Sequence, residues 1–220
     1  MSRIAKETFQ FLTRQNLTYL LGKKAKNLNA LLSGIKEVPL SSIYQHTHHY
    51  LEQHEYLSPE PPNDFAYWIT NVLQNDVLGE EIAGIDLRSI ISLKEIQSRL
   101  IEIIEKSIQR DPESANRNVP AGEEFHFMSA QTFVFPTQYI AHDLLEFKQC
   151  LQSVSNYSIY YHMFEAPLFQ QKAQFCYWIE NSLEDEKLAS ALRRLDPYTQ
   201  TLDNLKQNLI RLVRVRLEVK

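Results

Sequence analysis

The hydrophobic and polar residues of this chain follow two different periods. Phe9 and Phe11, and again Phe125 and Phe127, are spaced two residues apart, which is the period of a β-strand. Elsewhere the apolar residues recur every three or four positions, which predicts amphipathic helices. The clearest such set in the first half consists of Ala25, Leu28, Leu31, Leu32 and Ile35. The pattern therefore predicts a mostly helical protein with short strand-like segments.

Polar residues predict where further helices of the first half begin. Ser41 is an expected N-cap, and Asn63 comes directly before another apolar helical stretch. A fourth helix is expected over residues 78–85. Ser92 and Glu95 have the spacing of a capping box, which predicts the start of a long fifth helix. Five short helices would make a compact bundle.

The second half of the chain repeats the pattern of the first. Residues 9–46 align without a gap on residues 125–162, and ten of the 38 pairs are identical. About two or three identities would be expected from ordinary composition. After a shift of six positions, residues 65–73 match residues 175–183 with six identities in nine, including both tryptophans. Blocks matched in the same order predict two copies of one module.

These observations together predict the fold class and the domains. The protein is expected to be mainly α, with two tandem copies of a five-helix module, each of which could open with a short β-strand pair. The first module is placed at residues 1–110 and the second at residues 123–220. Residues 111–122 between them are polar and rich in helix-breaking residues, which is typical of a linker.

Composition narrows the range of functions. The net charge of −4 gives no general attraction to nucleic acid or to an anionic membrane, so we expect neither as a partner. Five glycines are few for phosphate-binding loops, and two cysteines are too few for a disulfide framework. No apolar signal core or membrane-length apolar run is found, so a cytoplasmic location is expected.

Two segments of each half resemble a known family. The first half contains VPLSSIYQHTH at residues 38–48 and PPNDFAYW at residues 61–68, and the second contains SIYYH at 158–162 and LDPY at 195–198. These strings resemble an uncharacterised bacterial family, domain of unknown function 5752. The resemblance covers nearly the whole chain, but it implies no activity and supplies no catalytic residues.

A histidine cluster is the most unusual feature of the sequence. Four of the seven histidines lie within nine residues, at His46, His48, His49 and His54. On a helix His46 and His49 lie one turn apart, and two such histidines can bind one transition metal ion. A divalent metal at His46, His49 and His54 is therefore the one cofactor considered. The alternative is a hydrogen-bonded helix with packed and solvated histidines, and the second copy retains only His162 of this set.

A ligand pocket on the first module is a second hypothesis. Its candidate residues are Tyr44, His46, His48, His49, Asp64 and Trp68. The equivalent residues of the second copy are Tyr160, His162 and Trp178. Residues that both copies share more often serve the common fold, because Trp and Tyr bury large areas. Packing is therefore the competing interpretation for the shared residues.

Three functions are compatible with these sequence features. A non-enzymatic binding or regulatory protein, with a protein or small-molecule partner, is favoured because no complete catalytic set is recognised. A metal-dependent enzyme of hydrolase type would use the His46–His54 cluster. A nucleic-acid-associated protein would use the basic residues of the last helix, Lys206, Arg211, Arg214, Arg216 and Lys220. Catalytic residues, ligand, reaction and oligomeric state are not indicated by the sequence.

Overall fold

The structure is a computed structural model that describes residues 4–48, 63–87, 92–168, 174–196 and 200–218. The described chain forms two compact units. The C-terminal unit contains the chain up to Gln15 and the chain from Thr132 onward. The N-terminal unit contains the described residues between Asn16 and Gln131.

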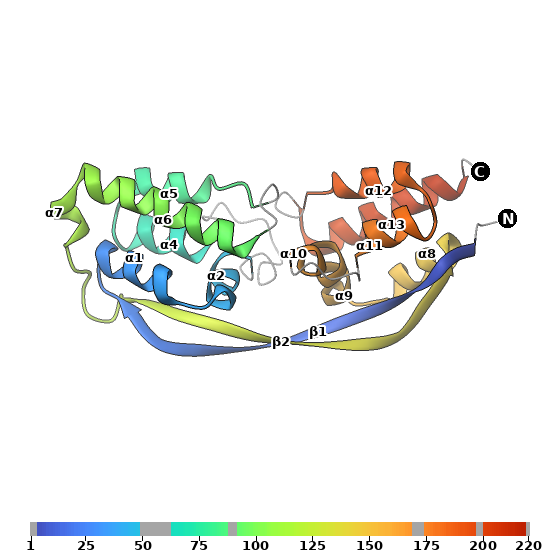
Figure 1. The fold of residues 1–220 in the computed structure, drawn as a ribbon, viewed down its shortest axis with the longest axis horizontal. Coiled ribbons are helices and arrows are strands. Elements are labelled where there is room, and N and C mark those ends of the chain that lie inside the picture. The colour runs from blue at the N-terminus through green and yellow to red at the C-terminus, as the bar shows by residue number, and fades with distance from the viewer. Residues whose placement is uncertain (1–3, 49–62, 88–91, 169–173, 197–199, 219–220) are drawn as a thin grey trace. The chain divides into compact units, whose positions relative to one another are not determined.

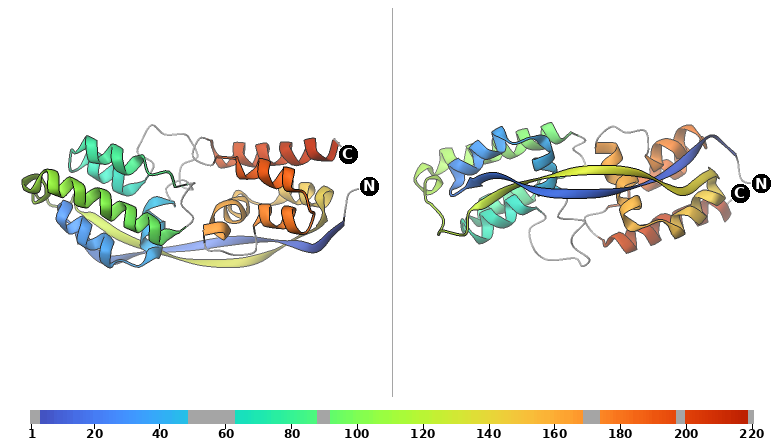
Figure 2. Two further views of the ribbon diagram at one scale, coloured as in Figure 1. Left: turned by 45° about the horizontal axis from the view of Figure 1, so that its top comes forward. Right: turned by 90° about the horizontal axis from the view of Figure 1, so that it is seen from below.

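Two long strands run through these units (Figure 1). β1 spans Ile4–Ala25 and β2 spans Phe125–Asp143, and they pair in a two-stranded antiparallel sheet. Both views of Figure 2 show the two strands side by side and twisted about each other, which is the usual right-handed twist of strands. The side chain of Gln10 ties them together by donating to the carbonyl of Thr137, 127 residues away in the sequence.

Short helices make up most of the remaining chain. Those of the N-terminal unit are α1 Leu28–Glu37, α2 Leu40–Thr47, α4 Asp64–Asn71, α5 Asp76–Ala83, α6 Leu93–Arg110 and α7 Pro112–Ala115. Those of the C-terminal unit are α8 Leu144–Ser153, α9 Asn156–Tyr160, α10 Ala166–Leu168, α11 Phe175–Asn181, α12 Glu186–Arg193 and α13 Leu202–Glu218. A single π-helical turn, η1 Tyr161–Glu165, joins α9 to α10.

The predicted fold class is wrong. Helices contain 59% of the described residues, but the strands of 22 and 19 residues form a long paired ribbon instead of a short strand pair within each copy. The five-helix plan also fails, because α7 follows α6 and because η1 and α10 follow α9. Local periodicity could not reveal the ribbon, because each strand finds its partner in the other half of the sequence.

The core of the C-terminal unit contains residues from the beginning of the chain. Phe9 and Phe11 of β1 are buried among α8, α11, α12 and α13. The Phe9 ring lies 5.8 Å from that of Phe147 and 5.4 Å from that of Trp178, between ring centroids. Rings at such distances and angles attract each other beyond the area they bury. The first strand therefore completes the core of the second group of helices.

The core of the N-terminal unit shows the reciprocal arrangement. Phe125 and Phe127 of β2 are buried, and the Phe125 ring lies 5.2 Å from Phe65 and 5.8 Å from Trp68. Phe127 packs against Gly34 of α1 so closely that a Cβ atom there would come within 2.2 Å of its ring. Each group of helices thus receives its Phe-x-Phe strand from the other half of the sequence.

Matching turns position α5 and α12. Gln74 directly precedes the N-cap residue of α5, and Glu184 directly precedes that of α12. Both have a positive φ, of 55° and 51° respectively. The side chains of the next residues, Asn75 and Asp185, each accept a hydrogen bond from the third backbone N–H that follows. Such N-caps satisfy amide groups that the first helical turn leaves without a partner.

Candidate functional site

His46 is buried in α2, where both of its ring nitrogens are engaged. Nε2 accepts the backbone N–H of Met128 in β2 at 2.9 Å. The ring proton is therefore on Nδ1, from which it is donated to Oδ2 of Asp64 at 2.8 Å. Only 1% of the His46 surface is exposed. The contacts of His46 thus connect a helix of the first half to the strand of the second half.

The other aromatic residues of the predicted pocket are also buried. Tyr44 is 2% exposed and Trp68 is 5% exposed. Trp68 Nε1 donates to the backbone carbonyl of Glu123 at 2.7 Å, just before β2 begins. The structure thus brings Tyr44, His46, Asp64 and Trp68 into one unit, in which His46 bonds to β2. Trp178, the equivalent of Trp68, is buried to the same degree, at 4% exposed, which supports the packing interpretation of the two tryptophans.

The equivalent residues of the second half make the same contacts with β1. His162 Nε2 accepts the backbone N–H of Leu12 at 2.8 Å. Trp178 Nε1 donates to the backbone carbonyl of Glu7 at 2.7 Å. Tyr160 and His162 are each 1% exposed. The shared histidine and tryptophan of each half therefore hold the strand of the other half in place, which supports the packing interpretation of these residues.

His48 follows α2 and is 5% exposed. The Thr47 hydroxyl donates its single proton to the carbonyl of Ile43. Its oxygen can therefore only accept in the 2.8 Å hydrogen bond with His48, in which Nδ1–H of His48 is the donor. The His48 ring stacks on that of Tyr44 at 5.4 Å between centroids. Burial lowers the pKa of His48 from 6.5 to about 4, so the imidazole is neutral at pH 7.

Metal binding by His46, His49 and His54 stays a prediction. His49 and His54 lie outside the described residues, and so does most of the proline-rich segment that precedes Asp64. Within the described part of the chain, no group of three His, Cys, Asp or Glu side chains could hold a metal ion. A metal ion at His46 would have to displace either the Met128 amide or the Asp64 carboxylate from the ring.

A buried ion pair distinguishes the C-terminal unit. Arg14 of β1 pairs with Glu165 at the end of η1, and each side chain is 1% exposed. The Arg14 guanidinium also lies 5.2 Å from the centre of the Tyr160 ring, a cation–π distance. The residue that aligns with Arg14 in β2 is Ala130. The ion pair was not predicted from the sequence, in which its one signal is an arginine that aligns with an alanine.

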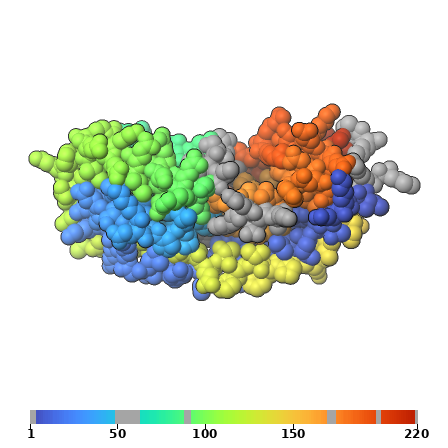
Figure 3. Space-filling view, viewed as in Figure 1, coloured from blue at the N-terminus to red at the C-terminus, as the bar shows by residue number. Residues whose placement is uncertain are grey.

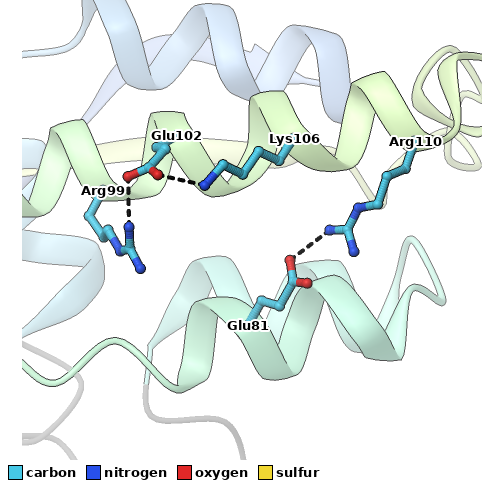
Figure 4. Close-up of polar contacts among 5 residues, drawn as sticks. All are labelled: Glu81, Arg99, Glu102, Lys106 and Arg110. Carbon is cyan, nitrogen blue, oxygen red and sulfur yellow. Dashed lines mark hydrogen bonds and ion pairs between the residues drawn. The ribbon is translucent and has the colours of Figure 1, made fainter.

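A charged cleft is present on the N-terminal unit between α5 and α6. Its volume is about 650 Å³, and it is lined by Glu81, Arg99, Ile103, Lys106, Gln109 and Arg110. Figure 4 shows Arg110 reaching across from α6 to Glu81 on α5, at 2.8 Å. Glu102 accepts from Arg99 and from Lys106, each at 2.7 Å. These bonds lower the pKa of Glu102, chiefly through Lys106, and the Glu81 bond raises the pKa of Arg110.

Each unit also exposes a pair of large apolar side chains on a strand. On β1 in the N-terminal unit, Leu17 is 59% exposed and Tyr19 is 47% exposed. On β2 in the C-terminal unit, Phe133 is 43% exposed and Phe135 is 47% exposed. The space-filling view shows part of β2, in yellow, at the molecular surface (Figure 3). We call these residues the Leu17/Tyr19 pair and the Phe133/Phe135 pair.

The fold and these surfaces define a two-unit protein in which paired strands complete two groups of helices. A model of a family of unknown function, DUF5752, matches residues 6–214. The chain therefore belongs to this family, as the sequence strings of its two halves indicated. No helix within the described ranges is long and apolar enough to cross a membrane.

A solved structure has the same fold. The structure of OrfY from Thermoproteus tenax is similar to this chain with a TM-score of 0.82 and 25% sequence identity, over 96% of each chain. A comparison with curated proteins gives no match. Function therefore has to be argued from the surfaces of the two units themselves.

Proposed function

We propose that this protein is a non-enzymatic binding protein whose two apolar strand pairs bind extended segments of a partner protein. The observation that carries the proposal is the exposure of the Leu17/Tyr19 and Phe133/Phe135 pairs, each between 43% and 59%. Large apolar side chains gathered on a surface are typical of interaction sites, because covering them with a partner removes apolar area from water.

The strand geometry indicates the conformation of the bound segment. Each pair occupies positions i and i+2, so its two side chains project from the same side of a strand. β1 and β2 form a two-stranded sheet, so each has one neighbouring strand within the described chain. An outer strand edge can hydrogen-bond to an extended peptide, while alternate side chains of that peptide contact the strand's apolar residues. The proposed partner segment therefore has apolar residues at alternate positions.

The cytoplasm is the proposed location of this activity. Cys150 and Cys176 are both free thiols, as is usual in a reducing compartment. Burial raises the pKa of Cys176 to about 11, so its thiol stays protonated and inert at neutral pH. This chemistry fits cysteines that serve as packing residues of a binding protein.

A displayed library of random twelve-residue peptides tests the proposal. Peptides selected on the intact protein are expected to carry apolar residues at alternate positions. Their affinity should fall at least tenfold for Leu17→Ser/Tyr19→Ser or for Phe133→Ser/Phe135→Ser. Val77→Ser/Tyr157→Ser is the matched control, because it removes two apolar side chains that are 62% and 54% exposed on helices. Selected peptides that bind both strand variants as well as the control would rule out this function.

A further inference from the structure

The α5–α6 cleft carries cations in excess. Three of its lining side chains are cationic, Arg99, Lys106 and Arg110, against the single carboxylate of Glu81. With Glu102, which bridges Arg99 and Lys106, the five side chains of Figure 4 have a net charge of 3 − 2 = +1. The whole chain has a net charge of −4. This cleft is therefore a local site for an anionic partner on an acidic protein.

The three cations keep much of their capacity to bind. The side chains of Arg99, Lys106 and Arg110 are 52%, 65% and 52% exposed. Their hydrogen bonds to Glu102 and Glu81 use one nitrogen of each arginine, although a guanidinium group has five N–H donors. Ion pairs exposed to this degree are weak and exchangeable, so an incoming carboxylate can add to them or replace them.

The spacing of the cations defines the length of the ligand. Arg99 and Lys106 are seven residues apart on α6, which is about 10 Å along a helix, and Lys106 and Arg110 are four apart, which is about 6 Å. One small anion cannot reach all three. An extended peptide rises about 3.3 Å per residue and points alternate side chains to the same side, so carboxylates at its first, third and fifth positions share one face and span about 13 Å, within reach of these long cationic side chains. Ile103 also lines the cleft between the cations, with 9% of its surface exposed.

We propose that the α5–α6 cleft binds an acidic, extended segment of a partner protein. This site is distinct from the apolar strand pairs, and it does not depend on the function proposed for them. The open cleft suits such a segment better than a small metabolite, because small-molecule sites usually bury most of the ligand surface. The carboxylates of the bound segment accept hydrogen bonds from Arg99, Lys106 and Arg110.

The probe for this site is a fluorescein-labelled hexapeptide with glutamates at positions one, three and five and alanines elsewhere. A second peptide has the same composition with its three glutamates adjacent. Fluorescence anisotropy at low salt is expected to show at least fivefold tighter binding of the spaced peptide. The affinity of the spaced peptide should fall at least tenfold when Arg99, Lys106 and Arg110 are all replaced by alanine.

The control for net charge replaces three exposed cations of the C-terminal unit, Lys187, Arg211 and Arg214, by alanine. This variant is expected to bind the spaced peptide within twofold of the unaltered protein. A tenfold loss in it would attribute binding to overall charge and overturn the proposal. The folding of both variants is checked by circular dichroism, which should be unchanged because all six side chains are exposed.

Removal of a competing carboxylate gives a second, independent readout. Glu81→Gln releases Arg110, so it should tighten binding of the spaced peptide at least threefold. Glu80→Gln, on the same helix but outside the cleft lining, makes the same charge change and should leave the affinity within 1.5-fold. Equal gains in the two variants, equal binding of the two peptides, or binding of inorganic tripolyphosphate alone would each overturn the assignment to an acidic protein segment.

Discussion

The Nε2 atom of His46 accepts the backbone N–H of Met128 at 2.9 Å, across 82 positions of sequence. His162 accepts the N–H of Leu12 in the same way at 2.8 Å. Both histidines are 1% exposed, and the strand residues Leu12 and Met128 are partly buried. Each histidine therefore binds one strand to the helices of its own unit. Removal of either side chain should lower the free energy of unfolding by at least the contribution of that hydrogen bond.

His46→Ala and His162→Ala are each expected to lower the free energy of unfolding by about 1–3 kcal/mol, plus a contribution from the cavity. Urea unfolding followed by circular dichroism measures this change. His142→Ala provides the control, because the His142 side chain is 59% exposed and should make no measurable difference. Unchanged stability of both buried-site variants would show that the amides find other acceptors.

The two tryptophans allow packing and hydrogen bonding to be separated. Trp178→Phe keeps an aromatic ring but loses the donor to the Glu7 carbonyl, so we expect a loss of about 1–2 kcal/mol. Trp178→Ala also creates a cavity and should cost about 3–5 kcal/mol. The same pair of substitutions at Trp68 should give the same order. Guanidinium unfolding curves test this, and an alanine variant that loses under 1 kcal/mol would contradict the burial argument.

The positions of the helices follow from the sequence more closely than the lengths of the strands. Asn63 was expected to begin a helix, and its side chain does accept from the N–H of Ala66 at the start of α4. Ser92 was expected to cap α6, but its side chain makes no capping hydrogen bond. The strands were underestimated because Leu17, Tyr19 and their neighbours are exposed, which leaves no alternation of buried and exposed positions to detect.

The candidate sites were predicted only in part, because some of their residues come together only through packing between helices. Tyr44, His46 and Trp68 stood out because both halves share them, and sharing marks residues that the fold requires. The cations of the α5–α6 cleft come from a single copy and resemble any solvated helix face. Only the pairing of α6 with α5 brings Glu81 opposite Arg110.

The buried pair of Arg14 and Glu165 should respond differently to single and double substitution. Arg14→Met leaves the Glu165 carboxylate buried without its cation and should cost about 3–5 kcal/mol. Arg14→Met combined with Glu165→Leu removes both charges, so the double variant should recover most of that loss. Thermal unfolding of the two single variants and the double variant forms the test. Additive losses would mean that the two side chains are not coupled.

His48 predicts a specific dependence of stability on pH. Its pKa is about 4 in the folded protein, against the ordinary histidine value of 6.5 in an unfolded chain, so the unfolded chain binds more protons between these values. The stability associated with neutral His48 is therefore complete above about pH 6.5 and is lost as the pH falls toward 4, by up to about 3 kcal/mol. His48→Gln should reduce the loss of unfolding free energy between pH 7 and pH 4.5. Identical pH profiles of the two proteins would refute this role of His48.

The exchange of strands between the halves predicts that a substitution in one half should loosen the helices of the other. Phe9 is near the start of the sequence, but it packs against Phe147 and Trp178 of the C-terminal unit. Phe9→Ala should therefore cost about 3–5 kcal/mol and increase hydrogen exchange in α8, α11 and α13 more than in α1 and α6. Mass spectrometry of native-state hydrogen exchange measures both sets of helices in one experiment.

The reciprocal substitution is the control for this exchange of strands. Phe127→Ala in the second half should loosen α1 and α6, because Phe127 lies against Gly34 of α1. Gly34→Ala should affect the same helices, since the added Cβ atom would come within 2.2 Å of the Phe127 ring. Hydrogen exchange could instead rise first in the helices that belong to the same half of the sequence as the substituted residue. That result would show that each strand supports its own half in solution. Opposite patterns for Phe9→Ala and Phe127→Ala would establish that each half of the sequence stabilises the other.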